Sequence, residues 1–192
     1  KRYVADKDTT ITNAFKANLS TRATGSNMGE SDVLEVFSLY GQATTSSIEL
    51  SRILVKFPIL TDVSSSRVNK EIPVSGSAKF FLKLYNAVHG ETLPKRYSIT
   101  LNSITRDWDE GYGLDMTNYS NTGSVNWVSA SSTNPWASEG GDYSYISTKY
   151  IDLGTEDLEI DVTDYVEAAI TSSDNGFLIK MSGSMESDTR SY

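Results

Sequence analysis

The sequence predicts an all-β fold: an antiparallel β-sandwich of jelly-roll type with one short helix near the C-terminus. Short segments of alternating apolar and polar residues have the two-residue period of half-buried strands. Polar turns separate them, and 28 serines and 19 threonines among the 192 residues supply many of the turn side chains. Many short strands joined by turns, with almost no helix, are typical of sandwiches and jelly rolls.

Eight segments are predicted to be strands. The clearest alternation runs over residues 52–59, with Ile53 and Val55 on one face and Arg52 and Leu54 on the other. The predicted strands are residues 5–11, 34–40, 52–59, 78–85, 97–103, 145–153, 158–162 and 177–181.

The one predicted helix covers residues 164–170. Thr163 could cap its N-terminus, since a threonine oxygen can accept a free N–H of the first turn. Val166, Ala169 and Ile170 recur at helical spacing and are expected to face the core.

Three segments are predicted to be turns or loops. The serines at 64–66 indicate a turn, and residues 18–32, small and polar, indicate an exposed connection. Residues 107–142 are too many for an ordinary connection. A loop of this length in a compact domain is usually functional or forms a structured flap.

Charge and composition exclude several classes of protein. A net charge of −8 and a pI near 4.7 argue against nucleic-acid binding, which needs clustered cations. No apolar run reaches the ~18–20 residues of a membrane-spanning helix, so no membrane insertion is predicted. The lack of cysteine excludes disulfides and thiol nucleophiles. We expect a single domain over residues 1–192, cut from a longer chain, because it begins at Lys1 rather than Met.

The sequence favours a protein that is not an enzyme. His89 is the single histidine, it lies in a turn, and no nucleophile elbow, phosphate loop or zinc-protease motif accompanies it. An exposed loop histidine is the simpler interpretation. A glycosidase pair drawn from Asp107, Asp109 and Glu110 is the remaining catalytic alternative.

Three aspartates are candidate calcium ligands. Asp107, Asp109, Gly111 and Asp115 follow one another at steps of two or four residues, as in an oxygen-rich turn. Ca²⁺ takes about six to eight oxygen ligands, and close carboxylates can supply several. The remaining positions of an EF-hand are missing, so the alternative is a solvated acidic turn.

Aromatic residues concentrate in residues 107–142, which contain all three tryptophans. Rings beside amides and hydroxyls can recognise sugars or partner proteins, because the rings stack while the polar groups give direction. The candidate ligand-binding residues are Trp108, Tyr112, Trp127, Trp136 and Tyr143. The alternative is a satellite core that pins the loop to the sheet.

A basic strand face is the second candidate surface for a ligand. Lys79 and Lys83 alternate with Phe81 and Tyr85, and Arg52 and Lys56 of another strand could extend the face. Cations between aromatic rings suit an anionic polysaccharide. They suit equally a solvated face whose lysines prevent edge-to-edge pairing.

A series of short motifs resembles one protein family. The motifs are Asp6 with Ile11, the strand 52–57, the strand 99–108 followed by Asp109-Glu110-Gly111, Asn126-Trp127, Trp136 with Gly140-Gly141-Asp142, and Asp161-Val162-Thr163 before a short helix and Gly176-Phe177. Their order, over nearly the whole chain, resembles the DNRLRE-type jelly-roll domain, a relative of carbohydrate-binding modules. The resemblance implies a mostly non-catalytic protein. Some members bind acidic polysaccharides such as alginate, and others are architectural.

The N-terminal segment, residues 3–15, resembles structural proteins of tailed phages. This resemblance implies a virion protein, located in the extracellular particle, whose partners are other virion proteins or further copies of itself.

Three functions follow. The first is a non-enzymatic structural or appendage domain of a phage virion that contacts host-surface or environmental glycans. The second is a carbohydrate-binding module for an acidic polysaccharide, and the third, least favoured, is a glycan-cleaving enzyme. None of the three functions requires a cofactor. Ca²⁺ is the one candidate cofactor, because Asp107, Asp109 and Asp115 could hold it.

Overall fold

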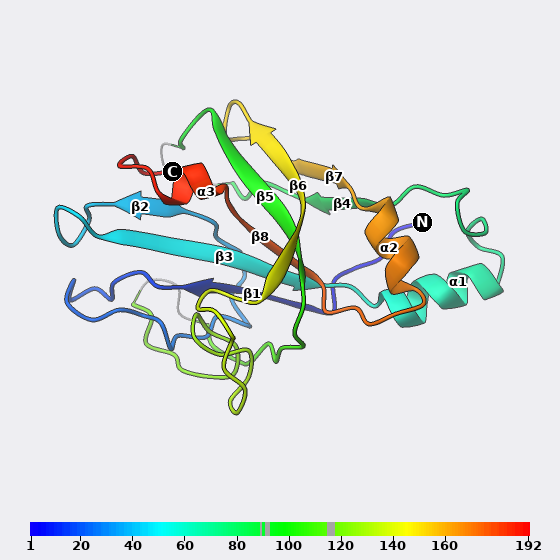
Figure 1. Ribbon diagram of the computed structural model, residues 1–192, viewed down its shortest axis with the longest axis horizontal. Coiled ribbons are helices and arrows are strands. Elements are labelled where there is room, and N and C mark those ends of the chain that lie inside the picture. Colours follow the sequence, from blue (N-terminus) through cyan, green and yellow to red (C-terminus); the bar gives the residue numbers. More distant parts are fainter. Residues whose placement is uncertain (89, 91–92, 115–117) are drawn as a thin grey trace.

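The computed structural model of the protein describes residues 1–88, 90, 93–114 and 118–192 (Figure 1). Its regular structure is mostly strand, every strand pairing in the described residues is antiparallel, and the helices are short, which confirms the all-β class. The strands are β1 (Lys7–Thr12), β2 (Ser38–Tyr40), β3 (Ile48–Lys56), β4 (Phe81–Leu84), β5 (Tyr97–Ile104), β6 (Tyr143–Ile151), β7 (Leu158–Asp161) and β8 (Phe177–Met181). The helices are the π-helical turn η1 (Ile59–Val63), α1 (Ser64–Val68), α2 (Thr163–Ala169) and α3 (Gly183–Glu186).

The described strands form two sheets. The larger has six strands, in the order β1-β3-β8-β5-β6, and β2 pairs with the first part of β3. β4 and β7 form a separate two-stranded sheet. The N-terminus lies at the end of the molecule that carries α1 and α2, whereas the C-terminus lies beside β2 and α3 (Figure 1).

The larger sheet has a core on each face. Ile53 of β3 shares the first core with Leu82 of β4 and Ile160 of β7, so the two-stranded sheet packs on this face. Leu54, the next residue of β3, belongs to the second core, which is built by the segment between β5 and β6. All five residues of β8 are buried. A strand covered on both faces is apolar at successive positions, as this one is at every position except Lys180.

The helices differ from the expectation of a single one. α2 lies at the predicted segment, with Val166 and Ala169 buried. Its N-cap is Val162 rather than Thr163, because the Thr163 hydroxyl accepts the N–H of Phe80 from the neighbouring strand.

Two further helical regions follow β3 and β8. The serines at 64–66, predicted as a turn, begin α1. The helical turn η1 ends directly before them and is held by the buried side chains of Ile59 and Val63, four residues apart. The chain therefore enters the serines already in helical conformation. Helix α3 follows β8. No helix within the described residues is long and apolar enough to cross a bilayer.

Residues 18–32 are only in part the exposed connection that their composition predicts: residues 18–21 are exposed, but the middle of the segment is buried. Ala23, Ser26, Asn27 and Met28 are buried. Their burial arises from contacts with residues about 80 to 100 positions later in the chain, such as the hydrogen bond from the Ser26 hydroxyl to the carbonyl of Tyr119. The local sequence contains no sign of these partners.

Candidate functional site

The three tryptophans lie in the second core rather than on the surface. Trp108, Trp127 and Trp136 are 1%, 4% and 6% exposed. The indole N–H of Trp108 donates to the carbonyl of Asn175 (2.9 Å), and that of Trp136 donates to the carbonyl of Asn126 (2.9 Å). Buried, hydrogen-bonded indoles hold the loop on the sheet, as the satellite-core interpretation describes, and they present no ring face to solvent in this structure.

Asn27 fixes the shape of the same segment. Its side-chain amide donates to the carbonyls of Glu110 (2.6 Å) and Val125 (2.8 Å), and its Oδ1 accepts the N–H of Gly113 (2.8 Å). A Cβ at Gly111 or Gly113 would collide with Asn27, so both positions require glycine. A fully bonded buried amide of this kind specifies one arrangement of the loop.

A buried charge network joins the sheet to the C-terminal helix. Arg52 of β3 donates to both carboxylate oxygens of Glu186 in α3 (3.2 and 3.1 Å), and Lys180 of β8 donates to the same carboxylate (2.7 Å). Arg52 also donates to the carbonyl of Gly140 (2.7 Å) and lies 4.8 Å from the centre of the Trp127 ring. Burial lowers the pKa of Lys180, although the Glu186 carboxylate opposes the shift.

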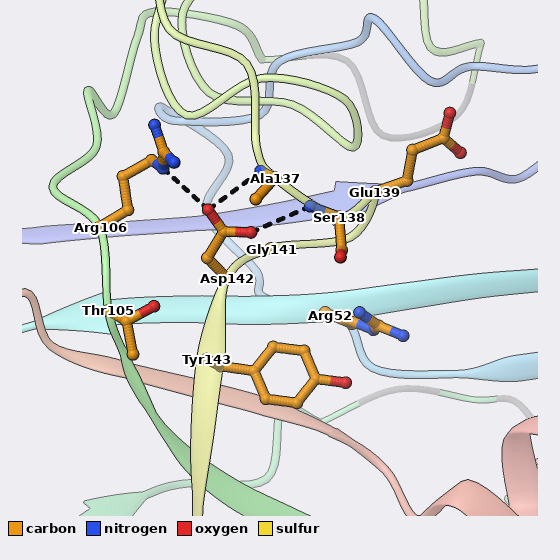
Figure 2. A pocket seen from close by; sticks show the side chains of 9 residues that line it. All are labelled: Arg52, Thr105, Arg106, Ala137, Ser138, Glu139, Gly141, Asp142 and Tyr143. Carbon is orange, nitrogen blue, oxygen red and sulfur yellow. Dashed lines mark hydrogen bonds and ion pairs between the residues drawn. The ribbon is translucent and has the colours of Figure 1, made fainter.

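An open polar hollow of about 640 Å³ lies where the loop enters β6 (Figure 2). The Asp142 carboxylate accepts the N–H groups of Ala137 and Ser138 (3.0 Å each) and the guanidinium of Arg106 (2.8 Å). Burial alone would raise the pKa of Asp142, but these donors together hold it below its ordinary value. Asp142 is therefore an ionised anchor of the loop, and Tyr143 continues the wall of the hollow onto β6.

A row of tyrosines continues from the hollow along β6. Tyr143 pairs with Ile104 of the second core, so its side chain lies on that face of the sheet. Tyr145 shares the face by alternation. The register of β5 and β6 then shifts at Leu101/Asn102, and this irregularity brings Thr148 and Tyr150 onto the face as well.

These four side chains, Tyr143, Tyr145, Thr148 and Tyr150, are called the tyrosine face below. The three rings are 37%, 65% and 56% exposed, in chain order. The Tyr145 hydroxyl lies 3.1 Å from the Thr148 hydroxyl. At a strand rise of about 3.3 Å per residue, the row extends over roughly 20 Å. Exposed rings with attached hydroxyls, on a strand that β5 holds in place, can stack on flat ligands and bond their edges.

Lys79 and Lys83 lie away from the tyrosine face, beside the two-stranded sheet. Each is near a carboxylate of β7: Lys83 lies 2.6 Å from Glu159, and Lys79 lies 3.9 Å from Asp161. Arg52 does not extend this surface, because it precedes Leu54 by two residues and points with it to the opposite face of the larger sheet. This part of the sequence prediction is wrong.

The predicted metal ligands are only partly described. Asp107 is exposed and lies 3.4 Å from Lys56, and Asp109 is exposed as well. Asp115 lies outside the described residues, as does His89. Among the residues that the structure describes, no group of three acidic or histidine side chains could hold a metal ion. Calcium binding stays a prediction.

The sequence singled out one member of the tyrosine face, Tyr143, and missed Tyr145 and Tyr150. The available signal was the recurrence of tyrosine along the predicted strand 145–153. Tyr112, also predicted, is 85% exposed but belongs to the loop that Asn27 holds.

In comparisons with protein-family models, curated proteins and solved structures, nothing matches this chain. The resemblance to the DNRLRE type stays a prediction from the sequence motifs. The function is therefore argued from the geometry of the residues above.

Proposed function

We propose that this chain is a non-enzymatic binding domain, a jelly-roll β-sandwich of the DNRLRE type. Within that class, we propose a structural or appendage protein of a tailed-phage virion that contacts glycans of the host surface or the environment. The observation that carries the proposal is the exposed row of Tyr143, Tyr145 and Tyr150 beside a polar hollow. Other virion proteins or further copies of the chain are its proposed structural partners.

The sheet arrangement supports the jelly-roll part of the proposal. Two antiparallel sheets share an apolar core, as the two halves of a sandwich do. Most of the regular structure is strand, and the connections between strands are long enough to pass from one sheet to the other.

The rigidity of the tyrosine face supports a binding role. Tyrosine loses little conformational freedom on binding, because its side chain has only two χ angles. β6 is held by β5 along its whole length, and the loop before it is anchored by Asp142. Such a surface needs little reorganisation to receive a ligand, which favours affinity.

A module for acidic polysaccharides is the second candidate function. Arg106, whose side chain is 43% exposed, lines the hollow beside Tyr143 and could meet a sugar carboxylate. Its guanidinium already contacts Asp142, which reduces the charge that it offers.

The glycosidase alternative is the least supported. Glu110 accepts the backbone N–H of Asp8 (2.6 Å), and Asp107 lies beside Lys56, so these carboxylates have structural partners. They belong to the rigid loop, whereas the exposed rings lie on β6.

Affinity gel electrophoresis tests the glycan part. The domain is run in gels that contain alginate or dextran, with calcium and with chelator. We expect retardation by at least one polymer, and Tyr145→Ala and Tyr150→Ala should each weaken it about tenfold, the loss of one stacked ring.

The matched control is Tyr112→Ala, since Tyr112 is a ring off the face that is at least as exposed as Tyr145 and Tyr150. An equal loss of retardation in Tyr112→Ala would place the glycan site in the loop of residues 107–142 instead of on the tyrosine face. No retardation of the unmodified domain by either polymer would reject the glycan function. Immunogold labelling of particles with antibodies against the domain tests the virion location separately.

A further inference from the structure

A second cavity, an apolar groove of about 610 Å³, lies on the first face of the larger sheet, away from the tyrosine face. All eight consecutive residues 78–85 line it, and residues 1–5 form part of its other wall. Val55 and Phe177 of the first core also line it. Eight consecutive lining residues mean that the groove runs along β4, including its edge.

The ladder between β4 and β7 shows which backbone groups face this edge. The N–H of Val162 donates to the carbonyl of Phe80 (2.9 Å), and Phe81 lies opposite Asp161. Bonded and non-bonded pairs alternate in an antiparallel ladder, so the N–H and C=O groups of Phe81 and Lys83 point away from β7. Within the described chain, no strand pairs with β4 on that side.

Apolar surface is exposed around the groove. Val4, Phe81 and Tyr85, which line it, are 69%, 45% and 67% exposed. An apolar surface beside an unpaired strand edge is a template for a further strand.

Among the residues that line the groove, cations outnumber carboxylates, in contrast to the whole chain. Four cations and one carboxylate line it, in a protein with a net charge of −8. The lining charges are those of Lys1, Arg2, Lys79, Lys83 and Asp8. Glu71, Asp161 and Glu159 each lie beside one of the three lysines and balance its charge, but they do not line the groove. Single, spaced acidic residues that contact Arg2 and the lysines of the rim therefore match the groove better than a strongly acidic run.

We propose that the groove is a docking site for an extended segment of a partner protein, with alternating apolar and acidic residues, that adds to β4 as a third strand. Its backbone bonds the N–H and C=O groups of Phe81 and Lys83. Its apolar side chains enter the groove, and its acidic side chains meet the basic rim. Strand addition of this kind combines main-chain hydrogen bonds with side-chain pockets. The site is independent of the proposed glycan function, since it lies on the other face of the larger sheet.

The test uses a fluorescein-labelled peptide of alternating isoleucine and glutamate, followed by fluorescence anisotropy. We expect saturable binding to the unmodified domain. Lys83→Pro should weaken it about tenfold or more, because proline removes the N–H that faces the groove while leaving the β7 side of the ladder intact. Lys83→Ala, which keeps that N–H, is the matched control and should bind with a smaller loss.

A second probe keeps the test valid if Lys83→Pro fails to fold. The same peptide with every backbone amide N-methylated has no N–H to donate along either edge, and it should not bind the unmodified domain. Thermal melts of the two Lys83 variants show whether the fold persists.

Three results would overturn the proposal. The first is equal binding of the N-methylated peptide, or of Lys83→Pro in its folded form, since the peptide would then occupy the groove without forming a strand. The second is no binding of the alternating peptide at about 1 mM. The third is binding of dodecanoate without binding of peptide, which would make the groove a site for amphiphiles.

Discussion

The two faces of the six-stranded sheet are covered in opposite ways. On the second face, an irregular segment closes the core over β1, β3 and β8; its tryptophans are buried and its polar groups have partners, whereas the part of this face along β6 stays exposed as the tyrosine face. The first face is covered by a regular two-stranded sheet, yet a groove remains beside it. A core can therefore be closed without regular secondary structure. Irregular backbone can do so where side chains such as Asn27 satisfy its N–H and C=O groups.

The residues that stabilise the fold also differ from those that we propose to bind ligands. The loop that the sequence marks as a binding site contributes its indoles to the core. Exposed rings and an unpaired edge lie on β6 and β4, whose backbones are fixed by neighbouring strands. Substitutions on the two faces should differ accordingly.

The largest effect is expected for Trp108→Ala. Removing this ring from the second core should lower the free energy of unfolding by about 3–5 kcal/mol, and the melting temperature by about 10 °C. Chemical denaturation and calorimetry measure both. The control is Phe81→Ala at the groove, 45% exposed, which should lose about 1 kcal/mol or less. Equal losses would mean that the two faces are closed to the same degree.

A smaller loss is expected for Glu186→Gln. The substitution leaves the buried Arg52 and Lys180 without the carboxylate that both contact, and should lower the free energy of unfolding by about 3 kcal/mol. Urea unfolding at pH 7 measures it. Glu159→Gln, which removes the exposed partner of Lys83, should change stability little. A loss in Glu159→Gln as large as that in Glu186→Gln would contradict the role of burial.

The smallest effect is expected for Glu167→Gln in α2, and it should depend on pH. The Arg67 guanidinium and the Ser75 hydroxyl lower the pKa of Glu167 to about 2. The pKa of the folded state is thus below that of the unfolded chain, near 4.5. The ionised carboxylate therefore stabilises the fold above about pH 4.5, and this contribution is lost as the pH falls towards 2.

Glu167→Gln should accordingly lower the free energy of unfolding by about 1 kcal/mol at pH 7, a value reduced for solvent screening. Near pH 2 the variant and the unmodified protein should unfold alike. Urea unfolding at pH 7, 4 and 2.5 checks this, and a difference that is constant over this range would contradict it.

Elements with an apolar pattern in their own sequence were predictable. β8 has the predicted bounds, β5 and β7 differ from theirs by one residue, and α2 lies where its apolar spacing places it. α1 was missed, because its serines carry no apolar periodicity and the helix continues from η1. β2 is shorter than predicted, because only Ser38–Tyr40 pairs with β3.

The candidate site was predictable only at Tyr143. Indole rings beside polar residues have the same composition in a binding loop and in a loop that closes a core, so the sequence left both interpretations of the tryptophans open. Their burial depends on Leu54 and Leu178 of distant strands, which the loop covers.

The sequence by itself determined the all-β class, most of the strands and the long irregular segment, because a two-residue period and turn residues are local properties. The tertiary structure decided which side chains share a face of the sheet and which distant segments contact each other. One register shift between β5 and β6 places Tyr150 on the same face as Tyr145, although the two are five positions apart and strict alternation would set them on opposite faces. Asn27 is buried because Glu110 and Val125, more than 80 residues later, surround it. Such contacts depend on the packing of distant segments, which no local pattern contains.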